Sequence, residues 1–235
     1  MLNRNAVEKL IRESAARNKK ARREYHLFEK TLISVKGNIL PSIDFSQIVA
    51  EIEEHMPPHL FEEIDYIFVG SFSENSERAL EAHYENGAIY ITSDLPTNRD
   101  YIENIVHEAA HAVEGQYGLS IYGDKNIENE FLGKRIKLAG RLTAEGVNVS
   151  ALDFEEPEYS EELDHFLYKS VGYEKLNNLV IGLFNSAYAS TSLREYFANG
   201  FEEYFLGDRA YLRKVSPQLY IKIEEIIMGD ENGYF

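Results

Sequence analysis

Residues 96–118 have the pattern of one long amphipathic helix, and this helix carries the motif His-Glu-x-x-His at residues 107–111. Its apolar residues recur at spacings of three and four, which predicts a buried stripe; they are Ile102, Ile105, Val106, Ala109, Ala110 and Val113. At about 100° per residue, His107 and His111 fall roughly 130–170° from the centre of that stripe. We therefore expect the two histidines to face a cleft and not the core.

Two histidines four residues apart on one helix face can bind a single zinc ion, and Glu108 then points at the remaining coordination site. The chain contains no cysteine. Any zinc site must therefore be built from His, Asp or Glu, which favours a catalytic over a structural zinc. The motif is short enough to occur by chance, and a surface helix with two exposed histidines is the alternative.

A catalytic zinc usually has three protein ligands, and two glutamates are candidates for the third. Glu130 lies nineteen residues after His111, a spacing typical of thermolysin-like and aminopeptidase-like enzymes. Glu195 lies on a later predicted helix, and residues 195, 198, 199 and 202 share one face of it. On that face, Asn199 or Glu202 could accept a hydrogen bond from a zinc-bound imidazole. Both candidate ligands stay open on this reasoning.

Two strings and one tyrosine carry a resemblance to a known family. The strings are His107-Glu108-x-x-His111-Ala112-Val113-Glu114 and Glu195-Tyr196-Phe197-Ala198-x-x-Phe201, and Tyr188 stands seven residues before Glu195. Together they resemble the catalytic domain of anthrax lethal factor and its relatives, which include the Pro-Pro endopeptidases of clostridia. The resemblance implies that Glu195 is the third zinc ligand. It also implies that Tyr188 assists catalysis by donating a hydrogen bond to the oxyanion.

The sequence departs from this family in two places. The stretch between His111 and Glu195 is longer than in lethal factor, so residues 125–170 resemble an inserted helical segment. Asn199 stands where the family pattern has an acidic residue, which leaves Glu202 to take over that role.

The predicted fold class is α+β and zincin-like, with a small, mainly antiparallel sheet before the motif helix and a largely helical C-terminal half. Residues 66–69 read as a buried strand, and Asn86-Gly87 predicts a hairpin turn between residues 82–84 and Ala88–Thr92. Helices are predicted over residues 4–35, 125–145, 159–183, 192–206 and 216–228. The predicted domains are a basic helical arm over residues 1–55 and a metallopeptidase domain over residues 56–235.

Ala88–Thr92 is expected to form the sheet edge beside the metal, because an extended substrate can pair with such an edge. Ala88 and Tyr90 are then the predicted substrate-binding residues. The alternative is an ordinary hairpin strand without substrate contact.

Charge is distributed unevenly along the chain. Residues 1–36 hold ten Lys or Arg and four Glu, a net charge of +6. The whole chain has a net charge of −16, so the remaining residues carry −22. Such an acidic body disfavours nucleic acid and favours a protein or peptide substrate with basic or neutral segments. The basic arm is predicted to dock on an acidic surface or on a protein partner; its charges include Arg17, Lys19, Lys20, Arg22 and Arg23.

No apolar run has the length of a membrane span, and the first residues lack the apolar core of a signal peptide. The expected location is therefore the cytoplasm, or a larger particle such as a virion. The sequence predicts a zinc metalloendopeptidase in which Glu108 is the general base. The alternative is a non-catalytic zincin-fold scaffold or assembly protein, for example part of a phage particle.

Overall fold

The computed structural model describes residues 23–71 and 81–232, and this part of the chain is a mixed α+β structure that forms two compact units. The first unit holds the described residues up to Glu54 together with Phe61–Ile105, and the second holds His55–Leu60 and the chain from Val106 onward. The division falls inside helix α3 (Asn98–Tyr122). Among the described helices, none combines the length and the apolar character that crossing a membrane requires.

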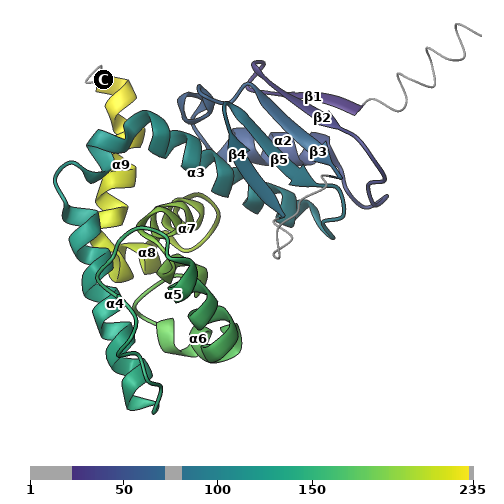
Figure 1. Cartoon of the computed structure of the whole chain (residues 1–235). Helices are drawn as coiled ribbons and strands as arrows, with labels where there is room; N and C mark the ends of the chain where they lie inside the picture. The colour runs from purple at the N-terminus through teal and green to yellow at the C-terminus, as the bar shows by residue number, and fades with distance from the viewer. Residues whose placement is uncertain (1–22, 72–80, 233–235) are drawn as a thin grey trace, which may run out of the picture. The chain divides into compact units, whose positions relative to one another are not determined.

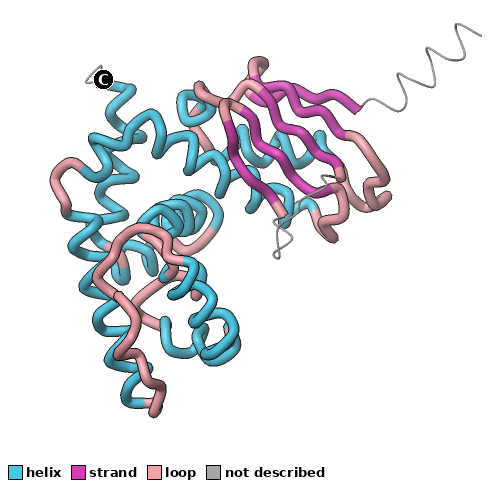
Figure 2. Tube along the Cα trace, viewed as in Figure 1, coloured by secondary structure: helices cyan, strands magenta, loops and turns pink. Residues whose placement is uncertain are grey.

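The first unit is built around one sheet, whose strands are drawn in magenta in Figure 2. Its strands are β1 (Arg23–Leu27), β2 (Thr31–Val35), β3 (Tyr66–Gly70), β4 (Ala82–Glu85) and β5 (Ala88–Thr92), in the spatial order β1-β2-β3-β5-β4. Ile33, Ile67 and Ile89 are fully buried at successive central strands. Helix α2 (Phe45–His55) lies over one face of the sheet (Figure 1), and its apolar residues Phe45, Ile48 and Ile52 are buried.

The sheet is mixed, so the prediction of a mainly antiparallel sheet is wrong. β1 pairs with β2, and β4 with β5, in antiparallel fashion, whereas β2 pairs with β3 and β3 with β5 in parallel. Parallel neighbours need a crossover connection, which the segment containing α2 provides between β2 and β3. The sequence shows the strands and the helix but not which strands become neighbours.

The long helix predicted over residues 4–35 is also wrong for its last part, because residues 23–35 form the hairpin β1–β2. Phe28 and Glu29 have positive φ angles of 53° and 58°, which turn the chain back on itself. Leu27 and Ile33 are then buried in the sheet. The predicted basic arm covers residues 1–55, and its residues 1–22, with most of its basic side chains, lie outside the described residues.

The turn at Asn86-Gly87 is confirmed, with φ angles of 49° and 80° that suit a two-residue hairpin. This turn folds β4 back along β5, so β5 lies between β3 and β4. The expectation that Ala88–Thr92 forms a sheet edge is therefore wrong, since β4 takes that position. The substrate contacts of Ala88 and Tyr90 stay a prediction.

The second unit is helical. After the C-terminal part of α3 it contains α4 (Asn126–Ala144), α5 (Glu161–His165), α6 (Tyr173–Val180), α7 (Leu193–Leu206), α8 (Arg209–Val215) and α9 (Pro217–Asn232). The predicted helix over residues 159–183 is interrupted by the π-helical stretch Phe166–Val171 and by Gly172, whose φ is 80°. Helix α8 was not predicted; Asp208 caps it by accepting hydrogen bonds from the amides of Ala210 and Tyr211.

Helix α7 is held in place by apolar packing. The ring of Tyr196 lies 5.4 Å from that of Phe131 on α4 and 5.7 Å from that of Phe184, measured between centroids. A Cβ atom at Gly200 would lie 2.1 Å from Cδ2 of Leu219, which is fully buried on α9. The small residue therefore lets α7 and α9 approach closely, and this packing fixes the face of α7 that carries Glu195.

Candidate metal centre

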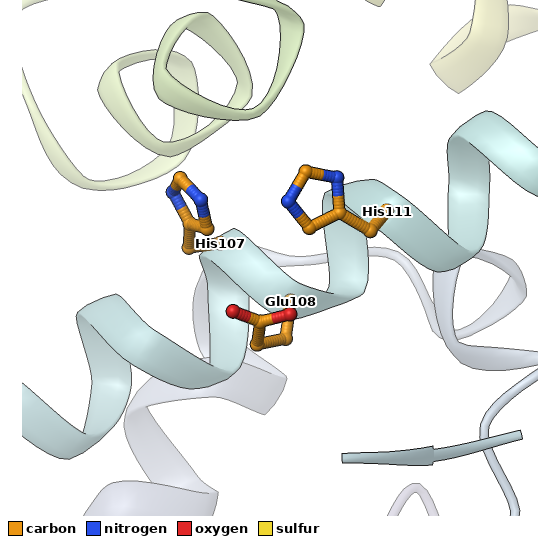
Figure 3. Close-up of side chains that lie close together, drawn as sticks. All are labelled: His107, Glu108 and His111. Carbon is orange, nitrogen blue, oxygen red and sulfur yellow. The ribbon is translucent and has the colours of Figure 1, made fainter. Parts of the chain in front are cut away.

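Helix α3 presents His107, Glu108 and His111 close together, as Figure 3 shows. Both imidazoles extend from the same side of the helix, and their ring centroids are 5.2 Å apart. The predicted apolar stripe is confirmed, because Ile105, Ala109 and the other stripe residues are buried. One ligand atom from each of His107, Glu108 and His111 lies within 4.8 Å of the other two, so this group could hold a metal ion.

Helix α7 brings Glu195 to the same two histidines. Its Oε2 lies 3.1 Å from Nε2 of His107, and its Oε1 lies 3.7 Å from Nε2 of His111. The local reason is the helix N-cap: the Ser192 side chain accepts a hydrogen bond from the amide of Glu195, which fixes the first turn of α7. Glu195 therefore faces both imidazoles from a rigid position.

The separation of these atoms can be compared with the requirement of a zinc ion. Zinc takes nitrogen and oxygen ligands at about 2.0–2.2 Å, so two ligands at a tetrahedral angle lie about 3.3–3.5 Å apart. The distances of 3.1 Å and 3.7 Å from the Glu195 carboxylate to the His107 and His111 Nε2 atoms lie on either side of this range. Small side-chain adjustments would suffice for the three residues to hold such a cation.

The far nitrogen of each imidazole also faces a carboxylate. Oε2 of Glu202 lies 3.5 Å from Nδ1 of His107, and Oε2 of Glu114 lies 3.5 Å from Nδ1 of His111. These carboxylates favour a proton on Nδ1, which leaves the Nε2 lone pairs free to bind a metal, and Nδ1 of His111 makes no hydrogen bond at this distance. This arrangement suits metal binding by both His107 and His111.

The two candidates for the partner of a bound imidazole are placed differently. Glu202 lies beside His107, whereas the Asn199 amide donates a hydrogen bond of 3.0 Å to the Glu195 carbonyl oxygen. The Asn199 side-chain oxygen accepts a second hydrogen bond, of 2.5 Å, from Ser186. Asn199 thus joins α7 to the preceding loop, and Glu202 is the residue that contacts an imidazole.

The electrostatics of the centre favour positive charge. Burial alone would lower the pKa of His107, but its hydrogen bonds to Glu195 and Glu202 outweigh that effect and raise the pKa to about 10. Burial likewise acts to raise the pKa of Glu195, yet the bond to His107 brings it below its usual value. Carboxylates that hold a proton on His107 this firmly would also attract a divalent cation.

Glu130, the other candidate ligand, is engaged elsewhere. Its carboxylate accepts hydrogen bonds from the Tyr196 hydroxyl at 2.7 Å and from the amides of Gln218 and Leu219 at 3.0 and 3.3 Å. Those two amides belong to the first turn of α9, where a carboxylate offsets the free N–H groups and the helix dipole. The contacts of Glu130 are therefore those of a carboxylate that stabilises the fold.

Tyr188 lies beside His107, and its predicted role in catalysis stays a prediction. It begins the short 3₁₀ helix Tyr188–Ser190, and its ring centroid is 6.4 Å from that of His107. Ala88 and Tyr90, by contrast, belong to the first unit, whereas His107, Glu108, His111, Tyr188 and Glu195 all belong to the second.

Sequence reasoning missed two side chains that contact Glu114. The Tyr122 hydroxyl donates to Glu114 Oε1 at 2.5 Å, and Arg194 Nε donates to Glu114 Oε2 at 2.9 Å. The spacing of Glu114 and Tyr122 along one helix gave a weak local signal. Nothing in the sequence indicates the contact with Arg194, because it joins α3 to α7.

Comparisons of the chain with protein-family models, with curated proteins and with solved structures found no match. The geometry of the centre is therefore the basis on which a function can be argued.

Proposed function

We propose that this protein is a zinc-dependent metalloendopeptidase with a zincin-like fold, whose zinc ligands are His107, His111 and Glu195. One observation carries the proposal: the carboxylate of Glu195, 88 residues after His107, lies against the Nε2 atoms of both motif histidines. An ordinary ion pair needs only one histidine. Two imidazoles and one carboxylate that converge, with a further carboxylate on each outer nitrogen, are typical of a catalytic zinc site.

Glu108 is the general base in this proposal. A bound zinc ion supplies Lewis acidity, which lowers the pKa of water and polarises a carbonyl oxygen. Glu108 is buried, and its carboxylate lies close enough to both imidazoles to reach a water molecule in front of them. Glu108 accepts a proton as the water oxygen bonds to the peptide carbon, and it returns this proton to the amine nitrogen as the C–N bond breaks.

Tyr188 is the proposed oxyanion donor. Its ring lies on the His107 side of the centre, and a phenol hydroxyl can donate a hydrogen bond to the tetrahedral intermediate. The resemblance to the lethal factor family supports the same role for this residue. The net charge of −16 favours a protein or peptide substrate whose cleaved segment is basic or neutral.

The test is cleavage of a diverse peptide library by the zinc-loaded protein, read by mass spectrometry beside Glu108→Gln. We expect cuts with the wild-type protein alone, while both proteins bind zinc equally. Glu103→Gln is the matched control, because it removes the same charge from the same helix at a position whose side chain is 38% exposed. Equal cutting by Glu108→Gln would refute the general base. Zinc binding without any cleavage would favour a scaffold, and no zinc binding would refute the metal centre.

A further inference from the structure

We propose that Glu114 is a positioning residue for His111, and that Tyr122 and Arg194 hold Glu114 in the required place. These three residues are called the Glu114 network below. The inference rests on the proposed function, since it concerns how the centre is prepared for its metal. It assigns a role to side chains that belong neither to the ligand set nor to the proton transfer.

Among the described residues, one ring nitrogen of His111 lacks a hydrogen bond. Its Nδ1 is buried and has no hydrogen-bond partner within the described part of the chain. Oε2 of Glu114 lies 3.5 Å from this nitrogen, which exceeds a normal N–H···O distance of about 2.9 Å. A buried N–H without an acceptor costs about 1–3 kcal/mol, so a slight rotation of His111 toward Glu114 is favoured. A hydrogen bond from Nδ1 to Glu114 would leave the lone pair on Nε2, which is the tautomer that binds a metal through Nε2.

The Glu114 carboxylate is itself held by hydrogen bonds from two sides. Tyr122 donates to one carboxylate oxygen at 2.5 Å, and Arg194 donates to the other at 2.9 Å. Burial, together with the Glu114 charge, raises the pKa of the Tyr122 hydroxyl, which therefore remains a donor. A carboxylate held by two donors has little rotational freedom, and this is the property that a positioning residue needs.

Arg194 connects the two helices that carry the proposed ligands. It precedes the proposed ligand Glu195 on α7, while its hydrogen-bond partner Glu114 follows the proposed ligand His111 by one turn on α3. The same pair thus connects the turn that carries one ligand to the turn that carries another. Separation of α3 and α7 would break this bond, so the network favours the arrangement in which His111 and Glu195 converge.

Glu202 provides an internal contrast on the His107 side. Its side chain is 31% exposed, against 14% for Glu114, and within the described part of the chain its carboxylate faces His107. A carboxylate that is more exposed and less constrained orients its histidine less strictly. We therefore expect Glu114 to contribute more to metal affinity than Glu202 does.

The experiment measures zinc affinity of the full chain by competition with a chromophoric chelator. Glu114→Ala should weaken affinity about 10–100-fold, the usual effect of losing such a partner. Glu202→Ala should have a smaller effect, and Glu114→Gln, which can still accept from Nδ1, should recover part of the loss. Glu145→Ala is the control, because it removes a glutamate that is 54% exposed in the same unit and should leave affinity unchanged.

Two further variants keep the inference testable if Glu114→Ala fails to fold. Arg194 is 56% exposed, so Arg194→Ala should fold normally, and Tyr122→Phe removes only a hydroxyl. Both should weaken zinc affinity several-fold and change the visible absorption of the Co²⁺-loaded protein, which reports ligand geometry. Wild-type affinity in every variant would overturn the role of the Glu114 network while leaving the metal centre intact. Absence of zinc binding by the wild-type protein would overturn both.

Discussion

Glu130 and Glu195 are both glutamates of the second unit with largely covered side chains, and each is a reasonable third ligand from the sequence. Their partners differ in kind. Glu130 accepts hydrogen bonds from a hydroxyl and two backbone amides, and it lies 4.0 Å from Lys134. Glu195 faces two imidazole nitrogens, which can become lone-pair donors to a metal. The type of partner, more than burial or spacing, separates a structural carboxylate from a proposed ligand.

The cations beside the two glutamates show the same difference. At Glu195, the hydrogen bonds to carboxylates overcome burial and raise the pKa of His107 to about 10. At Glu130, burial dominates and lowers the pKa of Lys134 to about 8, although the Glu130 charge acts in the opposite direction. One centre therefore favours positive charge, and the other merely tolerates it. This contrast is what a metal-binding function would require.

The largest expected effect is the loss of zinc binding in Glu195→Ala. The remaining ligands would be the two histidines, and affinity should fall by about 10³-fold or more, which corresponds to about 4 kcal/mol. Glu130→Ala, measured on its folded fraction, should keep the wild-type affinity. Competition with a chromophoric chelator measures both. An unchanged affinity in Glu195→Ala, or a comparable loss in Glu130→Ala, would reverse the assignment of the third ligand.

Glu130→Ala should instead lower the free energy of unfolding by about 3–5 kcal/mol. The change removes the acceptor of three hydrogen bonds and leaves the buried Lys134 ammonium without its carboxylate. Urea denaturation of the metal-free protein measures this loss, with Glu195→Ala as the comparison. A destabilisation below about 1 kcal/mol would show that Glu130 does not stabilise the fold through these hydrogen bonds.

A pair of tyrosines separates catalysis from stability in the same way. Tyr188→Phe should lower turnover by about 10²–10³-fold while zinc affinity stays unchanged, because the proposed oxyanion donor is lost and the proposed ligands are kept. Tyr196→Phe removes the hydroxyl that bonds to Glu130 and should cost about 1–3 kcal/mol of stability with normal turnover. Turnover on a cleaved library peptide and urea denaturation give the two readings. Normal turnover in Tyr188→Phe would remove Tyr188 from the mechanism.

The parts of the fold that the sequence predicts well are those with local causes. Helices α3, α4, α7 and α9 follow from apolar periodicity, and the hairpin β4–β5 follows from Asn86-Gly87. The hairpin β1–β2 reads as helix in the sequence because neither glycine nor proline interrupts the chain before Gly37, and the turn is made by Phe28 and Glu29 instead. Strand order depends on contacts between distant segments, so the mixed sheet and the interior position of β5 could not be read from any local pattern.

The candidate site likewise combines features with a local cause and features that depend on packing between distant segments. The four-residue spacing of His107 and His111 is a local property of one helix, and it places both imidazoles on one side of α3. The choice between Glu130 and Glu195 required knowledge of which helices meet. The bond between Glu114 and Arg194 is equally non-local. Local periodicity thus predicts which residues share a face, whereas packing decides which faces come together.

The smallest expected effect is the pH dependence that Lys134 contributes beside Glu130. Because the pKa of Lys134 is about 8 in the folded protein and 10.5 unperturbed, the unfolded state binds more protons between these values. The contribution of Lys134 to stability should therefore rise with pH in this window, by about 2 kcal/mol between pH 8 and 9.5, whereas His107, whose pKa is raised to about 10, contributes in the opposite direction. Urea denaturation of the metal-free protein, compared with Lys134→Met at each pH, isolates this contribution. Parallel stability curves for the two proteins would show that Lys134 keeps its ordinary affinity for the proton, and the electrostatic contrast with His107 would then disappear.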